Sequence, residues 1–248
     1  MGSEPLLVLW DIDHTLIDGG TASRSAYAAA FHRATGRPMT QTWRFDGRTE
    51  LAAATDVLRA HGVEPDADLV ENFVDLIVEE LEGRADVLAA EGHALPGADD
   101  ALAAVGALTN AHQSVLTGNL YPLAVLKMTV FGLADHVDFR IGAYGGDAYE
   151  RTDLPGRAFE RAERYLGLRF GGADTVIVGD TLRDIAAARA VGARVIGVAT
   201  GYTSAAELEA GGADVVLADL SDTAAVLRAL QPPVDHEVRS TTLRRVCN

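Results

Sequence analysis

The chain has 248 residues, of which 48% are hydrophobic and 23% charged, a composition typical of a globular protein with one sizeable core or a core and a small satellite domain. No apolar run approaches the ~20 residues that a membrane-spanning helix needs, which argues against a membrane protein. The formal net charge of −15 disfavours nucleic acid and anionic lipid as partners, and a site for an anionic substrate would need local positive charge.

The first part of the chain predicts one strand followed by a block of helices. Leu6–Trp10 is a continuous apolar run that ends in carboxylates, which indicates a buried strand opening onto a loop. Helices are expected over Thr21–Ala34, around Thr49–His61 and from about Asp66 to Ala90. In the last and longest of these, apolar residues recur at helical spacing.

After Pro96-Gly97, short apolar strands alternate with helices of about ten residues. This alternation predicts an α/β fold, a doubly wound, Rossmann-like parallel sheet with helices on both faces. The expected helices are Asp99–Leu108, Tyr121–Phe131, Pro155–Leu166, Leu182–Val191, Ala205–Ala210 and Thr223–Leu230, and the expected strands are Gln113–Leu116, Phe139–Gly142, Thr175–Val178, Arg194–Val198 and Asp214–Leu217.

This order predicts a core of residues 1–18 and 94–230, interrupted after its first strand by a helical cap of residues 19–93. A lid inserted there would lie over the carboxyl ends of the strands, where open parallel sheets bind their ligands. Residues 231–248 are polar, begin with prolines and lack periodicity, so we expect a peripheral tail.

The single cysteine, Cys247, allows no internal disulfide, and Met1–Trp10 shows no basic region or cleavage site typical of a secretory leader. We therefore expect a cytoplasmic protein. A monomer or a simple homo-oligomer is the default expectation for its assembly.

The sequence D-I-D-H-T-L places Asp11 and Asp13 directly after the first strand. A carboxylate can attack phosphorus once the negative charges are neutralised, and a second carboxyl group can serve as general acid and then general base. The alternative is a pair of capping or solvated aspartates, because D-x-D is a common tripeptide.

A second strand end carries G-D-T-L-R-D, with Asp180 and Asp184 on the same face one helical turn apart. The alternative is that Asp180 is a helix N-cap and Asp184 an ordinary first-turn acid, which is plausible for either residue alone. Magnesium prefers oxygen ligands and keeps several waters, so Asp11, Asp180 and a backbone carbonyl near Asp13 would suit it, with Asp184 holding a metal-bound water.

A third strand end reads V-L-T-G-N. The Thr117 hydroxyl and the exposed amides around Gly118 and Asn119 could bind a phosphoryl oxygen, although T-G-N also makes an ordinary turn.

The sequence resembles the haloacid dehalogenase-like hydrolase superfamily and, within that superfamily, the phosphoglycolate phosphatase-like branch. The resemblance is carried by three motifs in this order: D-x-D-x-T, a strand ending in threonine, and G-D-x-x-x-D. The resemblance covers nearly all of residues 5–230, including the place of the helical cap. It implies that Asp11 is the nucleophile, that Asp13 is the acid/base, and that Thr15 supports the loop.

The resemblance further implies that Thr117 binds phosphate, that Asp180 binds Mg²⁺ and that Asp184 supports the metal shell. Because dehalogenases of this superfamily lack the second aspartate, Asp13 favours phosphate chemistry.

One element departs from the family pattern, because the K-P-x-P segment that carries the charge-neutralising lysine is absent. Arg151, just before a helix, is the best-placed substitute, with Arg157 next and Lys127 as a further candidate. In the cap, Arg48 could reach the substrate. A solvated position is the alternative for both Arg151 and Arg48.

We therefore predict a Mg²⁺-dependent phosphomonoesterase that acts on a small phosphorylated metabolite through an aspartyl-phosphate intermediate. A sugar phosphomutase with the same chemistry and a non-catalytic binding protein on the same fold are the alternatives. Phosphoglycolate, a sugar phosphate and a phosphorylated biosynthetic intermediate all stay open as substrates, because the fold does not specify them.

Overall fold

A computed structural model describes residues 4–41 and 47–231. The predicted C-terminal tail, apart from Gln231, lies outside the described residues, as does Cys247. Among the described residues, no helix combines the length and apolar character needed to cross a bilayer.

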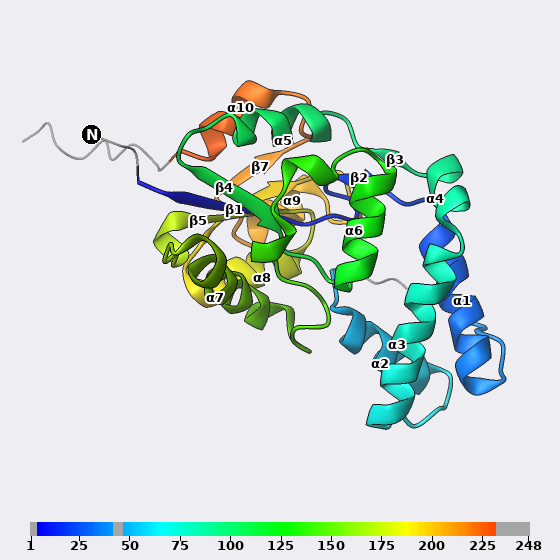
Figure 1. Ribbon diagram of the computed structural model, residues 1–248. Coiled ribbons are helices and arrows are strands. Elements are labelled where there is room, and N and C mark those ends of the chain that lie inside the picture. Colours follow the sequence, from blue (N-terminus) through cyan, green and yellow to red (C-terminus); the bar gives the residue numbers. More distant parts are fainter. Residues whose placement is uncertain (1–3, 42–46, 232–248) are drawn as a thin grey trace, which may run out of the picture.

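The centre of the molecule is a five-stranded parallel sheet, which confirms the predicted α/β fold (Figure 1). Its order is β4-β1-β5-β6-β7, and in the register of the sheet Trp10 lies opposite both Val115 and Val178. The loops that follow β1, β4 and β5 therefore start side by side at one edge. The strands are β1 (Leu6–Trp10), β4 (Ala111–Val115), β5 (Thr175–Gly179), β6 (Arg194–Val198) and β7 (Val215–Leu217).

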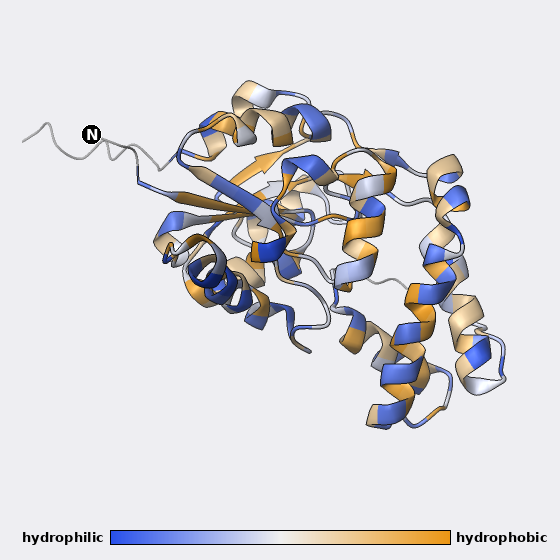
Figure 2. Cartoon of the chain, in the orientation of Figure 1, coloured by the Kyte–Doolittle hydropathy of each residue, from blue (hydrophilic) through white to orange (hydrophobic). Residues whose placement is uncertain are grey.

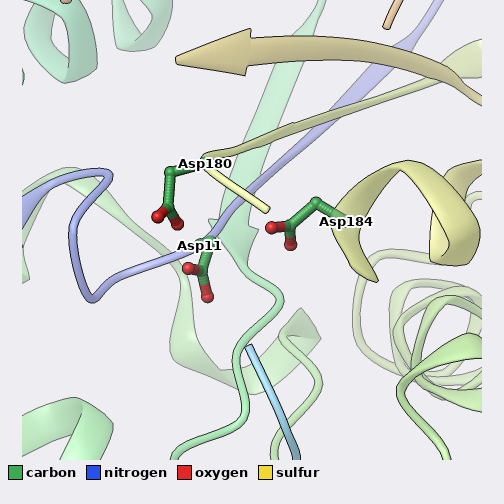
Figure 3. Close-up of side chains that lie close together, drawn as sticks. All are labelled: Asp11, Asp180 and Asp184. Carbon is green, nitrogen blue, oxygen red and sulfur yellow. The ribbon is translucent and has the colours of Figure 1, made fainter. Parts of the chain in front are cut away.

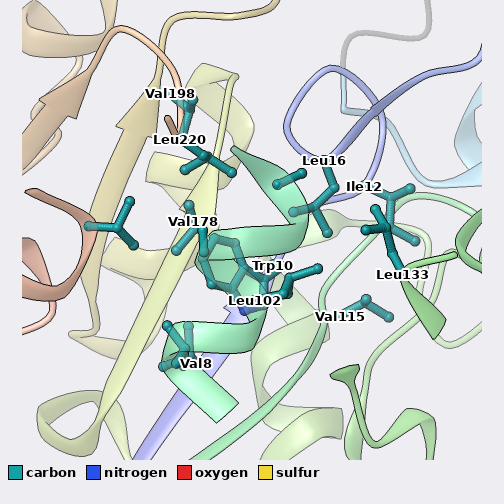
Figure 4. Close-up of a cluster of buried hydrophobic side chains, with 14 of the residues drawn as sticks. Val8, Trp10, Ile12, Leu16, Leu102, Val115, Leu133, Val178, Val198 and Leu220 are labelled. Carbon is teal, nitrogen blue, oxygen red and sulfur yellow. The ribbon is translucent and has the colours of Figure 1, made fainter. Parts of the chain in front are cut away.

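Two hydrophobic cores cover the two faces of the sheet, because successive side chains of a strand point to opposite faces. Val8 and Trp10 belong to the core that Figure 4 shows, and Leu7 and Leu9 belong to the other. The first core includes residues of α5 (Ala98–Gly106), α6 (Tyr121–Val130) and α10 (Thr223–Ala229), and the second residues of α7 (Leu154–Leu166), α8 (Leu182–Val191) and α9 (Ala205–Ala210).

A helical block stands apart from the sheet (Figure 1), and its hydrophobic core, which includes Phe31, Leu58 and Phe73, also includes Leu123 of α6. Hydrophobic and hydrophilic residues alternate along its helices (Figure 2), as expected for helices with one buried face. Its elements are α1 (Ala22–Thr35), α2 (Glu50–Ala60), α3 (Ala67–Glu82) and α4 (Ala85–Glu91).

The chain enters the helical block through β2 (Ile17–Asp18) and leaves it through β3 (His93–Ala94). These two segments lie side by side, because β2 pairs antiparallel with β3. These two-residue strands are too short to produce a sequence pattern, and the sequence did not predict them.

The single long helix predicted from about Asp66 to Ala90 is wrong, because the helix breaks after Glu82. Gly83 has low helix propensity, and the side chain of Arg84 donates to the carbonyl oxygen of Glu80 at 2.7 Å. That carbonyl group, at the end of α3, is thereby satisfied without a continuing helix.

The strand predicted over Phe139–Gly142 is also wrong: Phe139–Ile141 forms a 3₁₀ turn. The Asp138 side chain caps this turn by accepting from the backbone N–H of Arg140 at 3.0 Å. Pairing with the sheet is limited to one bridge, between Leu116 and Ala143.

Candidate active site

Three of the predicted acids meet at the carboxyl edge of the sheet. Asp11 follows β1, Asp180 follows β5 and Asp184 lies in the first turn of α8, and Figure 3 shows their side chains close together. One carboxylate oxygen from each lies within 4.8 Å of the others, and all three residues are buried.

The loop after β1 turns tightly, which brings Asp13 and Thr15 back toward the sheet. The carbonyl oxygen of Ile12 accepts from the backbone N–H groups of Thr15, Leu16 and Ile17, and His14 has a φ of 62°. The Thr15 hydroxyl then lies 3.4 Å from Asp180, so it links the loops after β1 and β5.

Arg151 supplies the positive charge at the acid cluster. Its Nη2 donates to Asp11 Oδ1 at 2.7 Å and to Asp184 Oδ1 at 2.5 Å, and its Nη1 donates to the carbonyl oxygen of Gly47 at 3.0 Å. The buried Nε has no hydrogen-bond partner among the described residues, so the guanidinium keeps an unused donor. Arg157, by contrast, is exposed and pairs with Glu160.

The cluster keeps an excess of negative charge, because one guanidinium faces three carboxylates. Burial raises the pKa of Asp11 to about 7 although Arg151 opposes the shift. Burial, followed by the charges of Asp11 and Asp184, raises the pKa of Asp180 to about 9. Carboxylates with such raised pKa values favour a proton or a metal cation as partner.

Asp184 is also fixed in place by its own helix. Its Oδ2 accepts from the Thr181 hydroxyl at 2.7 Å and from the Thr181 backbone N–H at 3.1 Å, in a capping box that starts α8. Asp184 is thus both a first-turn acid of α8 and a member of the acid cluster, while the N-cap is Thr181 and not Asp180, the residue that the sequence had suggested as a cap.

Asp13 lies in a separate network formed with the loop after β4 and with α6. Lys127 Nζ contacts both carboxylate oxygens of Asp13 at 2.8 Å, and Asn119 Nδ2 donates to Asp13 Oδ2 at 2.7 Å. Burial raises the pKa of Asp13, but the Lys127 ammonium and these hydrogen bonds together hold it below its ordinary value. The structure thus brings Lys127 to Asp13, whereas Arg151 lies at Asp11.

The T-G-N loop connects this network to the phosphate-binding position expected from the sequence. Thr117 Oγ1 accepts from Asn119 Nδ2 at 2.8 Å and from the Asn119 backbone N–H at 3.2 Å, and Asn119 Oδ1 accepts from Lys127 at 2.7 Å. Because Thr117 accepts these bonds, its hydroxyl hydrogen can be donated to a ligand.

The segment that leads into α2 crosses directly over the T-G-N loop. The Glu50 backbone N–H donates to the carbonyl oxygen of Gly118 at 2.9 Å, and a Cβ at Gly118 would lie 1.9 Å from the carbonyl oxygen of Arg48. Only glycine permits this approach at position 118. Arg48 lines the cavity, half-buried, with its guanidinium paired to Asp56.

A cavity of about 870 Å³ lies between the sheet and the helical block, and it is lined by Asp11, Asp13, Thr117, Arg151 and Asp180 but not by Thr15 or Asp184. It also contains Tyr27 and Glu50, which the sequence did not single out. The Tyr27 hydroxyl donates to Glu50 Oε1 at 2.9 Å, and burial raises the pKa of Glu50 to about 7. In the sequence, Glu50 looks like an ordinary first-turn acid after the N-cap Thr49, so no local signal marks it.

Part of this chain matches a protein-family model. Residues 155–223, which contain Asp180 and Asp184, match the family model described as HAD-hydrolase-like. No curated protein matches the chain.

Among solved structures, the chain resembles CbbY from Rhodobacter sphaeroides in complex with phosphate, with a TM-score of 0.68 and 20% identity over 87% of this chain and 95% of that one. It also resembles a putative beta-phosphoglucomutase from Bacteroides vulgatus (TM-score 0.67, 17% identity, 92% and 89% covered). A predicted phosphatase from Clostridium acetobutylicum is similar as well (TM-score 0.66, 19% identity, 91% and 100% covered). The family match covers residues 155–223, and the likeness to these solved structures extends the shared fold over most of the chain.

Proposed function

We propose that the protein is a Mg²⁺-dependent phosphomonoesterase that hydrolyses a small phosphorylated metabolite through an aspartyl-phosphate intermediate on Asp11. The observation that carries the proposal is the convergence of Asp11, Asp180 and Asp184 around Arg151, with Asp13 close by in the same cavity. The predicted phosphatase and the putative beta-phosphoglucomutase that share this fold, and the phosphate complex of CbbY, support the same class of chemistry.

The donor set suits magnesium. Asp11, Asp180 and Asp184 offer only oxygen ligands, and burial together with the neighbouring carboxylates raises the pKa values of Asp11 and Asp180, so a cation between them would be favoured. We propose that Asp11 and Asp180 hold the ion with a backbone carbonyl near Asp13, while Asp184 orients a water ligand. When bound, Mg²⁺ offsets the charge on the phosphoryl oxygens.

In the first step, Asp11 attacks phosphorus and the bond to the leaving oxygen breaks. The Arg151 guanidinium and the Thr117 hydroxyl stabilise the equatorial oxygens. Asp13 gives its proton to the departing alkoxide, which is the role of a general acid. Because Lys127 lowers the pKa of Asp13, Asp13 must gain this proton as the dianionic substrate enters.

In the second step, the ionised Asp13 removes a proton from a water molecule that attacks the phosphorus of the aspartyl phosphate. Lys127 and Asn119 hold the Asp13 carboxylate in place for this transfer. We propose that the helical block acts as a cap that closes over the cavity and excludes bulk water, with the paired β2 and β3 as its connection to the core.

The test is phosphate release from p-nitrophenyl phosphate and from a panel of phosphorylated metabolites, with Mg²⁺ and without it. We expect turnover that requires the ion and that disappears in Asp11→Asn, a variant of nearly the same shape. Substantial activity of purified Asp11→Asn would show that Asp11 is not the nucleophile.

A phosphomutase would use the same acids but would protect its phospho-enzyme from water. The same assay, run without any bisphosphate activator, separates the two functions. Sustained release of inorganic phosphate supports the phosphatase, whereas a single turnover that stops at the phospho-enzyme would favour the mutase.

A further inference from the structure

The cavity has a second polar region, formed by α1 and α2, that the proposed chemistry does not use. Tyr27 orients Glu50 by donating to its Oε1 at 2.9 Å, and Glu50 Oε2 receives no hydrogen bond from any described residue. Ser23 lies one turn before Tyr27 on the same face of α1 and lines the same cavity. Its Oγ also has no partner within the described part of the chain.

The cations near this region are already engaged or exposed to water. The Lys127 ammonium has three donors, and its three short contacts are to the two oxygens of Asp13 and to Asn119. The guanidinium of Arg48 is paired with Asp56. Arg24 and Arg183 line the cavity too, but both are exposed, so solvent screens their charges.

A leaving group therefore meets hydrogen-bond acceptors and negative charge on this side of the cavity. Glu50 and Asp13 act electrostatically on each other, and the charge of Lys127 acts on both. A hydroxyl group can donate to Glu50 Oε2, whereas a carboxylate would face the Glu50 carboxylate and would find no free ammonium donor on Lys127. Ile77, Leu81 and Leu123 also line the cavity and can pack against a carbon skeleton.

We propose that Glu50, oriented by Tyr27, binds a hydroxyl group of the leaving alcohol, so that the enzyme selects hydroxylated, uncharged leaving groups over carboxylated ones. This specificity rests on the proposed phosphatase function. It makes phosphate esters of polyols or sugars the substrate class, and it makes phosphoglycolate and other phosphorylated acids poor substrates.

The test compares three-carbon phosphate esters that differ at the leaving group. Glycerol 1-phosphate carries two hydroxyl groups, 3-phosphoglycerate replaces the terminal hydroxymethyl group by a carboxylate, and propyl phosphate carries neither. We expect kcat/KM for glycerol 1-phosphate to exceed that for each of the others by about tenfold or more. Propyl phosphate has no hydroxyl group to donate to Glu50, and 3-phosphoglycerate, which keeps its middle hydroxyl group, places a carboxylate beside that acid.

Two substitutions test whether Glu50 and Tyr27 cause this preference. Glu50→Gln should reduce the ratio of kcat/KM for glycerol 1-phosphate to that for propyl phosphate by about tenfold, and it should also reduce discrimination against 3-phosphoglycerate. Tyr27→Phe should reduce both in the same direction, but less. Glu71→Gln, an identical change at an exposed position of α3 outside the cavity, should leave both ratios as they are.

The outcomes separate the specificity from the function. Wild-type turnover of p-nitrophenyl phosphate with equal kcat/KM for the three esters, or with 3-phosphoglycerate preferred, overturns the specificity and leaves the phosphatase in place. A Glu50→Gln variant that lowers all three values equally also overturns it, because Glu50 would then act on the fold or the chemistry. No turnover of any of these esters would count against the phosphatase function itself.

Discussion

Arg151→Met is the most informative single change at the acid cluster. The side chain is 4% exposed and connects Asp11, Asp184 and the carbonyl oxygen of Gly47. Methionine keeps much of the volume but removes the charge and all of these donors. Two buried carboxylates would then face each other without a counter-charge.

The expected stability loss follows from this burial. Removing one partner of a buried ion pair costs about 3–5 kcal/mol, and each kcal/mol lowers Tm by about 2–4 °C in a chain of this size. We therefore expect the metal-free variant to melt about 6–20 °C below the wild type. Because Asp11 and Asp180 have raised pKa values, protonation relieves part of the repulsion, so the loss should be smaller at about pH 6 than at about pH 8.

The expected kinetic loss is larger than a general loss of stability would produce. Removing one preorganised donor to a developing charge lowers kcat by about 10²–10³-fold, and we expect that range for p-nitrophenyl phosphate below the melting temperature. Arg151→Lys should recover part of it, since an ammonium keeps the charge but cannot span the same acceptors.

The matched control is Arg161→Met on α7. Arg161 pairs with Asp147 and donates to the carbonyl oxygen of Gly142 at 2.7 Å, outside the cavity. This control should lower Tm but keep kcat/KM near the wild-type value. A folded Arg151→Met variant whose kcat/KM stays within about threefold of the wild type would refute the role assigned to Arg151.

Two further predictions concern pH. In EDTA, the free energy of unfolding should fall from about pH 5 to about pH 9, because Asp11 and Asp180 bind protons more tightly in the folded chain than in the unfolded one. Added Mg²⁺ should raise Tm most at the alkaline end of this range. In a thermal-shift assay, Asp180→Asn should weaken the dependence of both quantities on pH. A Tm in EDTA that is independent of pH would contradict this. Lys127→Met should move the acidic limb of the pH–kcat profile to higher pH by about one to three pH units, because the ammonium that lowers the pKa of Asp13 is lost, whereas Lys127→Arg should largely keep the limb in place. If the acidic limb stays unchanged in Lys127→Met, that limb does not report the ionisation of Asp13.

The sequence predicted the sheet and the acids because both have local signals. A strand such as Leu6–Trp10 is a continuous apolar run, and the parallel arrangement places the residues that follow β1, β4 and β5 at one edge. Asp11, Thr117 and Asp180 therefore could be assigned to one site before their positions were known. The errors at Gly83 and at Phe139–Ile141 have the opposite cause, because side-chain hydrogen bonds from Arg84 and to Asp138 decided the local backbone.

The partners of Lys127 and the place of Glu50 could not be predicted in this way. Lys127 reaches Asp13 across 114 positions of the chain, and Glu50 reaches the cavity only because the segment before α2 crosses over Gly118. Such contacts depend on how the helical block is placed on the sheet. No pattern within either segment encodes that placement.

The proposed function requires a chain of net charge −15 to accept a phosphate dianion in this cavity. When all four side chains are ionised, the three carboxylates of Asp11, Asp180 and Asp184 and the guanidinium of Arg151 have a net charge of −2, which one divalent cation would cancel. Asp13 and Lys127 cancel each other. The metal-loaded cluster is therefore neutral rather than attractive, so affinity for the substrate must come from directed donors such as Arg151 and Thr117. Glu50 lies away from this cluster, where we propose that it acts on the leaving group and not on the phosphate.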